Sequence, residues 1–418
     1  MKCKMICALA AATFVAVPAL AADIVLSIGA RGYGPAVERN LERFAAVNPD
    51  MDVQWNKVSD VPGETRKLYV TGLMAKSPTP DIFAVDVIWA GEFAQRGWLQ
   101  PMNGLLSDEV IGNFNSSLLT ASTVDGKVHA LPLYTDGIHF FYRSDLLDKY
   151  NLDVPKTWED VLAASKTIVE GEGNPQLYGF VSMWAKIEGL FMNWLAFTNG
   201  NGGGFYDSKG NVAVNSAANI EATQYMVDLL HKHQMAPQSI LNSRPNDART
   251  LFQQGRAVFL MVQDFVHAPL SADDSPVAGK FDFTRVPYFA GNEDANTTTM
   301  GGWFLGINPN SKNMKEAAEF IEHFTAYEQQ LAAAVEDKRA PTIPAVYDNA
   351  MMDDAKVLAK FGTNYNFGVV RPSADTGSNY PKVSETMQLA ITNALNQTMS
   401  VADALNAAQA DLEVILAD

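Results

Sequence analysis

Carboxylates and aromatic residues stand together at several predicted turns and strand ends of this sequence. Asp86 ends an apolar stretch and is followed by Trp89, and Tyr134-Thr135-Asp136 occupies a predicted turn before another strand. Aromatic faces stack on the C–H surface of a sugar ring, and carboxylates accept charge-assisted hydrogen bonds from its hydroxyl groups. The pattern favours binding of a hydroxyl-rich ligand by Asp86, Tyr134 and Asp136. The alternative for Asp86 is that it only caps a following helix.

Three further candidates come later in the chain. Gly301-Gly302-Trp303 places an indole beside two glycines, and we expect the absent side chains to let a ligand approach the backbone at Gly302. Phe265 follows the apolar stretch Val258 to Val262, and Arg371 lies in a loop rich in Tyr and Asn. Trp303 is the strongest candidate for a ring that stacks on the ligand.

For the remaining candidates, a role in packing or as a surface charge is about as well supported as contact with the ligand. Trp184, Glu188 and Trp194 surround a segment rich in aromatic residues, where either Trp could belong to the core or contact the ligand. Arg66 lies on a predicted helix, either as a solvated charge or at the edge of a cleft. Arg66, Trp184 and Glu188 complete the predicted set of ligand contacts.

Most catalytic motifs are absent from the sequence. No Gly-x-Ser-x-Gly or phosphate-loop motif occurs after the N-terminal segment, and His231 and His233 are spaced to point to different faces of a helix. We therefore expect no metal and no cofactor. Paired carboxylates such as Asp86 and Asp136 would suit a glycoside hydrolase. A non-catalytic binding protein is the favoured interpretation, and a secreted glycoside hydrolase is the alternative.

Alternating strands and helices are predicted to position Asp86, the first of the candidate carboxylates in the sequence. Strands are expected at residues 24–28, 51–55 and 81–86, with helices at 36–47 and 63–76 between them. This order is typical of a parallel sheet covered on both faces, which is an α/β fold. Strands at 128–132 and 138–143 are expected to flank a turn from Leu133 to Gly137.

The sequence of the second half of the chain predicts mostly helices. Thr157 and Asp160 form a capping box at the start of one helix. A strand is predicted at 303–307, after the glycine pair. The other predicted helices cover residues 92–96, 220–231, 247–254, 315–336 and 383–416.

The first 21 residues have the pattern of a secretory signal peptide. Lys2 and Lys4 precede an apolar run at residues 6–18, and Ala19-Leu20-Ala21 is a small-x-small cleavage site. The only cysteines, Cys3 and Cys7, lie inside this segment, so the exported chain is expected to lack disulfides. A bacterial periplasm is the expected destination.

Length and charge restrict the architecture and the partners. A chain of 418 residues is too long for one compact core and suits two lobes. The net charge of −16 repels nucleic acid and anionic lipid, and favours a soluble monomer.

An ordered series of motifs resembles the solute-binding proteins of bacterial ABC importers for carbohydrates, in particular the group of maltose- and trehalose-binding proteins. The resemblance covers essentially the whole exported chain. The motifs include Asn48-Pro49-x-Met51-x-Val53, Pro80-Asp81-Ile82-Phe83-x-x-Asp86, Gly97-Trp98-Leu99-x-Pro101, Leu131-Pro132-x-x-Thr135-Asp136, Pro155-Lys156-Thr157-Trp158, Gly301-Gly302-Trp303, Arg339-Ala340-Pro341-Thr342, and Arg371-Pro372 with Tyr380 and Ser384.

This resemblance implies two α/β lobes that close around a sugar by a hinge, with more than one chain crossing between them. We predict lobe one at residues 22–132 and 285–340, and lobe two at 133–284 and 341–418. In similar proteins the positions that match Asp86, Asp136, Trp303 and Arg371 contact the sugar. The implied partners are a carbohydrate and the permease subunits of an ABC importer. A disaccharide or glycoside is the leading ligand, and a polyol, a monosaccharide or an anionic sugar derivative is the alternative.

Overall fold

The computed structural model describes residues 24–29, 34–59, 62–337 and 339–417. The predicted signal peptide lies outside these residues. The chain begins with the predicted parallel strands β1 (Ile24–Gly29), β2 (Val53–Val58) and β3 (Ile82–Asp86). Both β2 and β3 pair with β1 in parallel, and α1 (Gly34–Val47) and α2 (Pro62–Met74) connect the three strands. The prediction of an α/β fold is confirmed.

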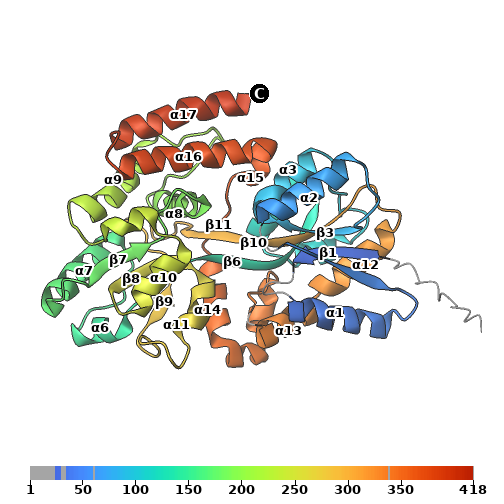
Figure 1. The fold of residues 1–418 in the computed structure, drawn as a ribbon, viewed down its shortest axis with the longest axis horizontal. Helices are drawn as coiled ribbons and strands as arrows, with labels where there is room; N and C mark the ends of the chain where they lie inside the picture. The colour runs from blue at the N-terminus through green and yellow to red at the C-terminus, as the bar shows by residue number, and fades with distance from the viewer. Residues whose placement is uncertain (1–23, 30–33, 60–61, 338, 418) are drawn as a thin grey trace, which may run out of the picture.

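One sheet runs through both halves of the molecule. Within the described residues it has nine strands, of which seven follow the order β2-β1-β3-β10-β6-β8-β7. Strands β6 (Ala130–Tyr142) and β10 (Thr298–Ile307) lie at its middle and extend from one half to the other (Figure 1). One half of β6 pairs with β10, and the other half pairs with β8 (Ala257–Gln263) and β9 (Asp282–Thr284). These long strands connect a first lobe, built on β1 to β3, with a second lobe, built on β7 to β9.

Helices cover both lobes (Figure 1). Those of the second lobe include α16 (Tyr380–Leu395), which contacts α8 (Glu188–Asn199), α9 (Ala217–His231) and α17 (Val401–Ala417). The short helix α15 (Ser373–Thr376) instead contacts α3 (Val87–Gln95) of the first lobe. The remaining helices and strands are α4 (Asp108–Gly112), α5 (Ser116–Ala121), β4 (Thr123–Val124), β5 (Lys127–Val128), α6 (Ser144–Lys149), α7 (Trp158–Glu172), β7 (Tyr178–Ser182), η1 (Gln238–Asn242), α10 (Pro245–Gln253), η2 (Asp264–Val266), α11 (His267–Leu270), α12 (Met314–Thr325), α13 (Tyr327–Asp337), η3 (Pro344–Asp348), η4 (Ala350–Ala355), α14 (Lys356–Tyr365), β11 (Gly368–Val369) and η5 (Gly377–Asn379).

The predicted turn from Leu133 to Gly137 is wrong, because this segment is the centre of the continuous strand β6. Its residues pair with β10, so neighbouring strands on the sheet satisfy the backbone that a turn would expose to water. The glycine pair Gly301-Gly302 likewise lies inside β10 and does not precede it. A β-bulge between Trp303 and Phe304 shifts the register of the two strands at this point.

Several helix boundaries also differ from the prediction. The helix predicted at 315–336 is two helices, α12 and α13, that meet at Ala326. The helical region 383–416 divides into α16 and α17, and α3 begins at Val87 instead of residue 92. The predicted capping box is confirmed, since the Thr157 side chain accepts from the Asp160 backbone while the Asp160 carboxylate accepts from the Thr157 backbone.

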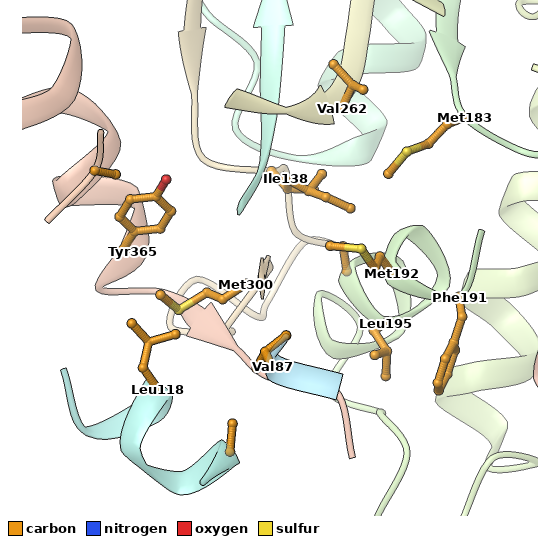
Figure 2. Packing of buried hydrophobic residues seen from close by; sticks show 14 of the residues in the cluster. Val87, Leu118, Ile138, Met183, Phe191, Met192, Leu195, Val262, Met300 and Tyr365 are labelled. Atoms are coloured by element: carbon orange, nitrogen blue, oxygen red, sulfur yellow. The ribbon is translucent and has the colours of Figure 1, made fainter. Parts of the chain in front are cut away.

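The hydrophobic core continues across the two long strands. Ile138 of β6 and Met300 of β10 are fully buried, and Figure 2 shows both with Val87 of the first lobe and Met192 of the second. Fixed packing at the crossing holds the candidate side chains of β3, β6 and β10 in register. No helix in the described part of the chain is both long and apolar enough to cross a membrane. The predicted lobe boundaries stay a prediction.

Candidate functional site

Strand β10 brings candidate residues from both neighbouring strands onto one face of the sheet. Trp303 pairs with Asp86 of β3 on one side and with Tyr134 of β6 on the other. Gly301, two residues before Trp303, pairs with Asp136. Residues directly opposite each other in paired strands present their side chains on the same face. Four predicted site residues, Asp86, Tyr134, Asp136 and Trp303, are therefore neighbours although they are distant in sequence.

The two glycines of β10 are required by close contacts inside the sheet. A Cβ atom on Gly301 would lie 2.3 Å from Oδ1 of Asp136 and 3.4 Å from Nη2 of Arg371. A Cβ atom on Gly302, whose φ is +142°, would lie 2.4 Å from the Tyr134 carbonyl oxygen. The space beside Trp303 is thus filled by the protein's own polar groups. The approach of a ligand to the backbone at Gly302 stays a prediction.

Arg371 is held by a carboxylate from the second lobe. Its side chain is 6% exposed, and its Nη1 donates to Oε1 of Glu188 at 3.1 Å. The Glu188 carboxylate also accepts hydrogen bonds from the hydroxyl groups of Tyr380 and Ser384. Glu188 is the first residue of α8, where the helix dipole favours a negative charge. The observed role of Glu188 is to fix Arg371 and α16 in place.

Burial shifts the ionisation of both carboxylates that face Arg371. It raises the pKa of Asp86 to about 6, although the Arg371 charge and a hydrogen bond from the Ile88 backbone act in the opposite direction. The same N–H to Oδ1 bond, 3.1 Å long, makes Asp86 the cap of α3. Burial also raises the pKa of Asp136, against the charges of Arg371 and Arg339. Both groups are acceptors for ligand hydroxyls when ionised and donors when protonated.

A cavity of about 510 Å³ opens next to Asp136 and Tyr134. Its wall combines two carboxylates, cationic groups and aromatic rings, and Phe265 in this wall is 48% exposed. The Arg339 guanidinium lies over the Tyr134 ring, 5.3 Å from its centroid. The lining residues are Tyr134, Thr135, Asp136, Asp264, Phe265, His267, Ala268, Arg339, Ala340, Lys356, Val357, Leu358 and Phe361. Apolar surface with a few convergent polar groups, at this volume, is typical of a small-molecule site.

Trp303 and Arg371 are not among the residues that line this cavity. Trp303 is partly buried and meets the edge of Trp89, with ring centroids 5.5 Å apart. Asp136 joins the two regions, because its carboxylate lies beside the Arg371 guanidinium and also lines the cavity.

Two predicted contacts lie elsewhere. Nη2 of Arg66, on α2, donates to the buried carboxylate of Glu92 at 2.6 Å, so its charge is already paired on the first lobe. Trp184 is 1% exposed and packs against Phe180 and Phe197 in the second lobe. The structure places Trp184 in the core, which was one of its two predicted environments.

Comparison with known proteins identifies the family. A family model described as bacterial extracellular solute-binding protein matches residues 31–331. A probable ABC transporter-binding protein of Deinococcus radiodurans is 31% identical over 366 residues, which are 85% of this chain and 85% of that protein. The chain belongs to the bacterial extracellular solute-binding protein family.

Solved structures agree with this assignment. The structure of maltose-bound T. maritima MalE3 is 32% identical, with a TM-score of 0.79, and the match covers 94% of this chain and 99% of that one. The cyclic alpha-maltosyl-1,6-maltose binding protein from Arthrobacter globiformis has a TM-score of 0.81 at 23% identity, covering 94% of this chain and 98% of that one, and supports the fold alone. The predictions of the family and of its two-lobed fold are confirmed.

The family membership bears on two other predictions. These relatives are binding proteins and not enzymes, which agrees with the favoured interpretation of the paired carboxylates. The family is an extracellular one, which agrees with export from the cytoplasm. Within the described residues of this solute-binding protein, no group of three or more His, Cys, Asp or Glu side chains is placed to hold a metal ion.

Among the cavity residues absent from the predicted set, two charged ones stand in stretches that carried a signal. Asp264 directly precedes Phe265 and follows β8, as Asp86 ends β3. Arg339 belongs to one of the family-like motifs. The hydroxyl of Tyr365, which donates to Oδ2 of Asp264 at 2.5 Å, had no recognisable pattern of its own.

Proposed function

We propose that this protein captures a sugar outside the cytoplasm and delivers it to the membrane subunits of an ABC importer, without catalysing a reaction. The observation that carries the proposal is the cavity of about 510 Å³ beside β6, where Tyr134 and Phe265 supply aromatic surface and Asp136 and Arg339 supply hydrogen-bonding groups. The family and the two-lobed fold give the means of delivery, because lobes joined by crossing strands can close around a ligand by a hinge.

The proposed ligand is a disaccharide or glycoside, with an α-glucoside such as maltose or trehalose as the leading choice. The 32%-identical structure was solved with maltose, which supports this choice. A polyol or a monosaccharide would use less of the aromatic surface. An anionic sugar derivative is disfavoured, because Arg371 already faces Glu188, Asp86 and Asp136.

The proposed contacts fall into two groups. Asp136, Tyr134 and Phe265 would contact the ligand from the cavity wall. Asp86, Gly302, Trp303 and Arg371 would contribute where the ligand extends along β10. Arg66, Trp184 and Glu188 would support the lobes from positions where their present partners hold them.

We further propose a monomer that is exported by its N-terminal signal into a bacterial periplasm. The net charge of −16 supports a monomeric, freely diffusing protein. Size-exclusion chromatography with light scattering tests the monomer, and N-terminal sequencing of protein recovered from a periplasmic extract tests cleavage after Ala21.

Titration calorimetry with a carbohydrate panel tests the proposed function. The panel should hold maltose, trehalose, glucose, mannitol and glucuronic acid. Hydrolysis should be assayed with maltose, trehalose and the aryl glycosides of glucose and glucuronic acid. We expect saturable binding of an α-glucoside and no turnover. Glycoside hydrolysis that Asp86→Asn or Asp136→Asn abolishes would instead establish the paired-carboxylate enzyme.

A further inference from the structure

The carboxyl group of Asp264 accepts a hydrogen bond from a buried tyrosine. It stands at the end of β8, where η2 begins, and it lines the cavity beside β6. Its Oδ2 accepts a hydrogen bond of 2.5 Å from the hydroxyl of Tyr365, a residue of α14 that is 4% exposed. This bond restricts the rotation of the carboxyl group, which lines the cavity.

The groups that face Asp264 come from five other segments. Asp136 of β6 is a second carboxylate on the same cavity wall, and Arg339 is a cation there. Tyr365 and the exposed Lys356 come from α14, and Tyr347 comes from η3. His267 follows on α11, where burial lowers its pKa and favours the neutral ring.

Two carboxyl groups that line the same cavity resist simultaneous ionisation. Burial, together with the charge of Asp136, raises the pKa of Asp264 to about 8, although Tyr365, Arg339 and the Phe265 backbone act in the opposite direction. Asp136 lies nearer to guanidinium charge, since both Arg371 and Arg339 favour its ionised form. The shared proton therefore belongs on Asp264 at neutral pH. Because Oδ2 already accepts from Tyr365, we assign the proton to Oδ1.

We propose that Asp264 binds the ligand as a neutral carboxylic acid, which donates a hydrogen bond from Oδ1 to an oxygen of the sugar and makes capture weaken at alkaline pH. This proposal rests on the proposed function of sugar capture. The chemical class it selects is a glycoside, whose ring and glycosidic oxygens accept hydrogen bonds but cannot donate them. Asp136 is the complementary acceptor for hydroxyl groups, so the two carboxyl groups distinguish the two kinds of sugar oxygen.

Replacement of Asp264 by asparagine tests hydrogen-bond donation without the negative charge that the aspartate gains at high pH. Asp264→Asn keeps an acceptor for Tyr365 and presents an N–H₂ donor to the cavity at every pH. The affinity of the parent protein for maltose or trehalose should fall by up to about tenfold per pH unit above the Asp264 pKa. Asp264→Asn should bind as the parent does at neutral pH and should lose the alkaline decline. Asp264→Leu should bind weakly at every pH.

Two further variants make this test specific. Tyr365→Phe removes a hydrogen bond that favours the ionised form, so it should move the alkaline decline to higher pH. Asp282→Asn is the matched control, because Asp282 pairs with Lys360 of the same helix α14 and does not line the cavity. It should leave the pH profile of binding unchanged. Thermal unfolding of each variant shows whether it is folded.

The outcomes distinguish this proposal from the proposed function. If no sugar binds to the parent at any pH, both are wrong. If maltose or trehalose binds with an affinity that does not change between neutral and alkaline pH, sugar capture stands and the neutral Asp264 is wrong. Weak binding by folded Asp264→Asn at neutral pH would also overturn the proposal, because it would show that the parent uses the ionised carboxylate.

Discussion

The carboxylates around Arg371 and those around the cavity have similar chemistry but different partners. Glu188 accepts hydrogen bonds from the side chains of Arg371, Tyr380 and Ser384, so its partners are other residues and not a ligand. Asp136 and Asp264 line the cavity in which we propose that the ligand binds. The difference shows that residue type alone does not identify a ligand contact, because the partners of a carboxylate decide whether it positions the site or faces the ligand.

Asp136 connects the two regions, and the account depends on this connection. Its carboxylate lies where a side chain on Gly301 would be, next to Arg371, and it also lines the cavity. We call Arg371, Glu188, Tyr380 and Ser384 the Arg371 cluster. Substitutions in this cluster should therefore weaken ligand binding by displacing Asp136. Substitutions on the far wall of the cavity should leave the cluster intact.

Gly301→Val should have the largest effect. A Cβ atom there would lie 2.3 Å from Oδ1 of Asp136, so Asp136 and Arg371 would have to move apart. We expect sugar binding to weaken by more than about a hundredfold, together with a lower melting temperature, since misplaced buried charges cost several kcal/mol. Calorimetry and thermal unfolding measure the two effects.

Gly112→Ala is the matched control for this substitution. Gly112 ends α4, and a Cβ atom there would have no neighbour within 4 Å. It should bind and melt as the parent does. Parent-like binding by Gly301→Val would mean that the cavity does not depend on the Arg371 cluster.

A comparison of Asp136→Ala with Glu188→Ala tests the division between the two regions. Asp136→Ala removes a charge-assisted hydrogen bond to the ligand, worth about 1.5–3 kcal/mol, so affinity should fall by roughly tenfold to a hundredfold or more. Glu188→Ala leaves Arg371, Tyr380 and Ser384 without their acceptor, so the free energy of unfolding should fall by a similar amount while affinity changes less. If Glu188→Ala lost affinity and kept its stability, Glu188 would be a direct ligand contact.

Trp303→Ala should have a smaller effect on binding, by about tenfold to a hundredfold. A ring stacked on a sugar face contributes on the order of 1–3 kcal/mol. Ligand addition should also change the tryptophan fluorescence of the parent, and this variant should lose much of that change. Trp303 is partly buried against Trp89, so a variant that binds normally but melts at a much lower temperature would show that Trp303 is a packing residue.

The smallest expected effect is the change of stability with pH. Because the pKa of Asp86 is raised to about 6 in the folded state, the folded protein binds this proton more tightly than the unfolded chain does. This contribution is complete below the unfolded pKa of about 3.9 and is lost as pH rises through about 6, at no more than about 1.4 kcal/mol per pH unit. Urea unfolding across this range should show the decline, and Asp86→Asn should reduce it. An unchanged slope in Asp86→Asn would assign the decline to other groups.

The first lobe was predictable because its strands carry strong local signals. Apolar runs between turn residues specify β1 and β3, and both lie within one residue of their predicted limits. The segment from Leu133 to Gly137 was mistaken for a turn because its polar and glycine residues also occur in turns. Its strand conformation comes from pairing with β10, whose residues lie more than 150 positions away.

The candidate site was predictable only in part for the same reason. Asp86, Tyr134, Asp136 and Trp303 were found because each belongs to a local motif, and pairing across β10 brings them together. The partners of Glu188 lie 183 to 196 residues away, so no local pattern distinguishes its positioning role from a ligand contact. Arg66 and Trp184 show the same ambiguity, since a partner charge or a packed ring is visible only in the folded protein.

A crystal structure of the protein with the compound that it retains from its native host tests the central claim most directly. We predict a glycoside in the cavity beside β6, with a hydroxyl group donating to Asp136, an acceptor oxygen facing Oδ1 of Asp264, and a sugar ring near Tyr134. Glu188 should keep its bonds to Arg371, Tyr380 and Ser384. A compound bound elsewhere, or one that contacts Glu188 while Asp136 makes no contact with it, would contradict the account.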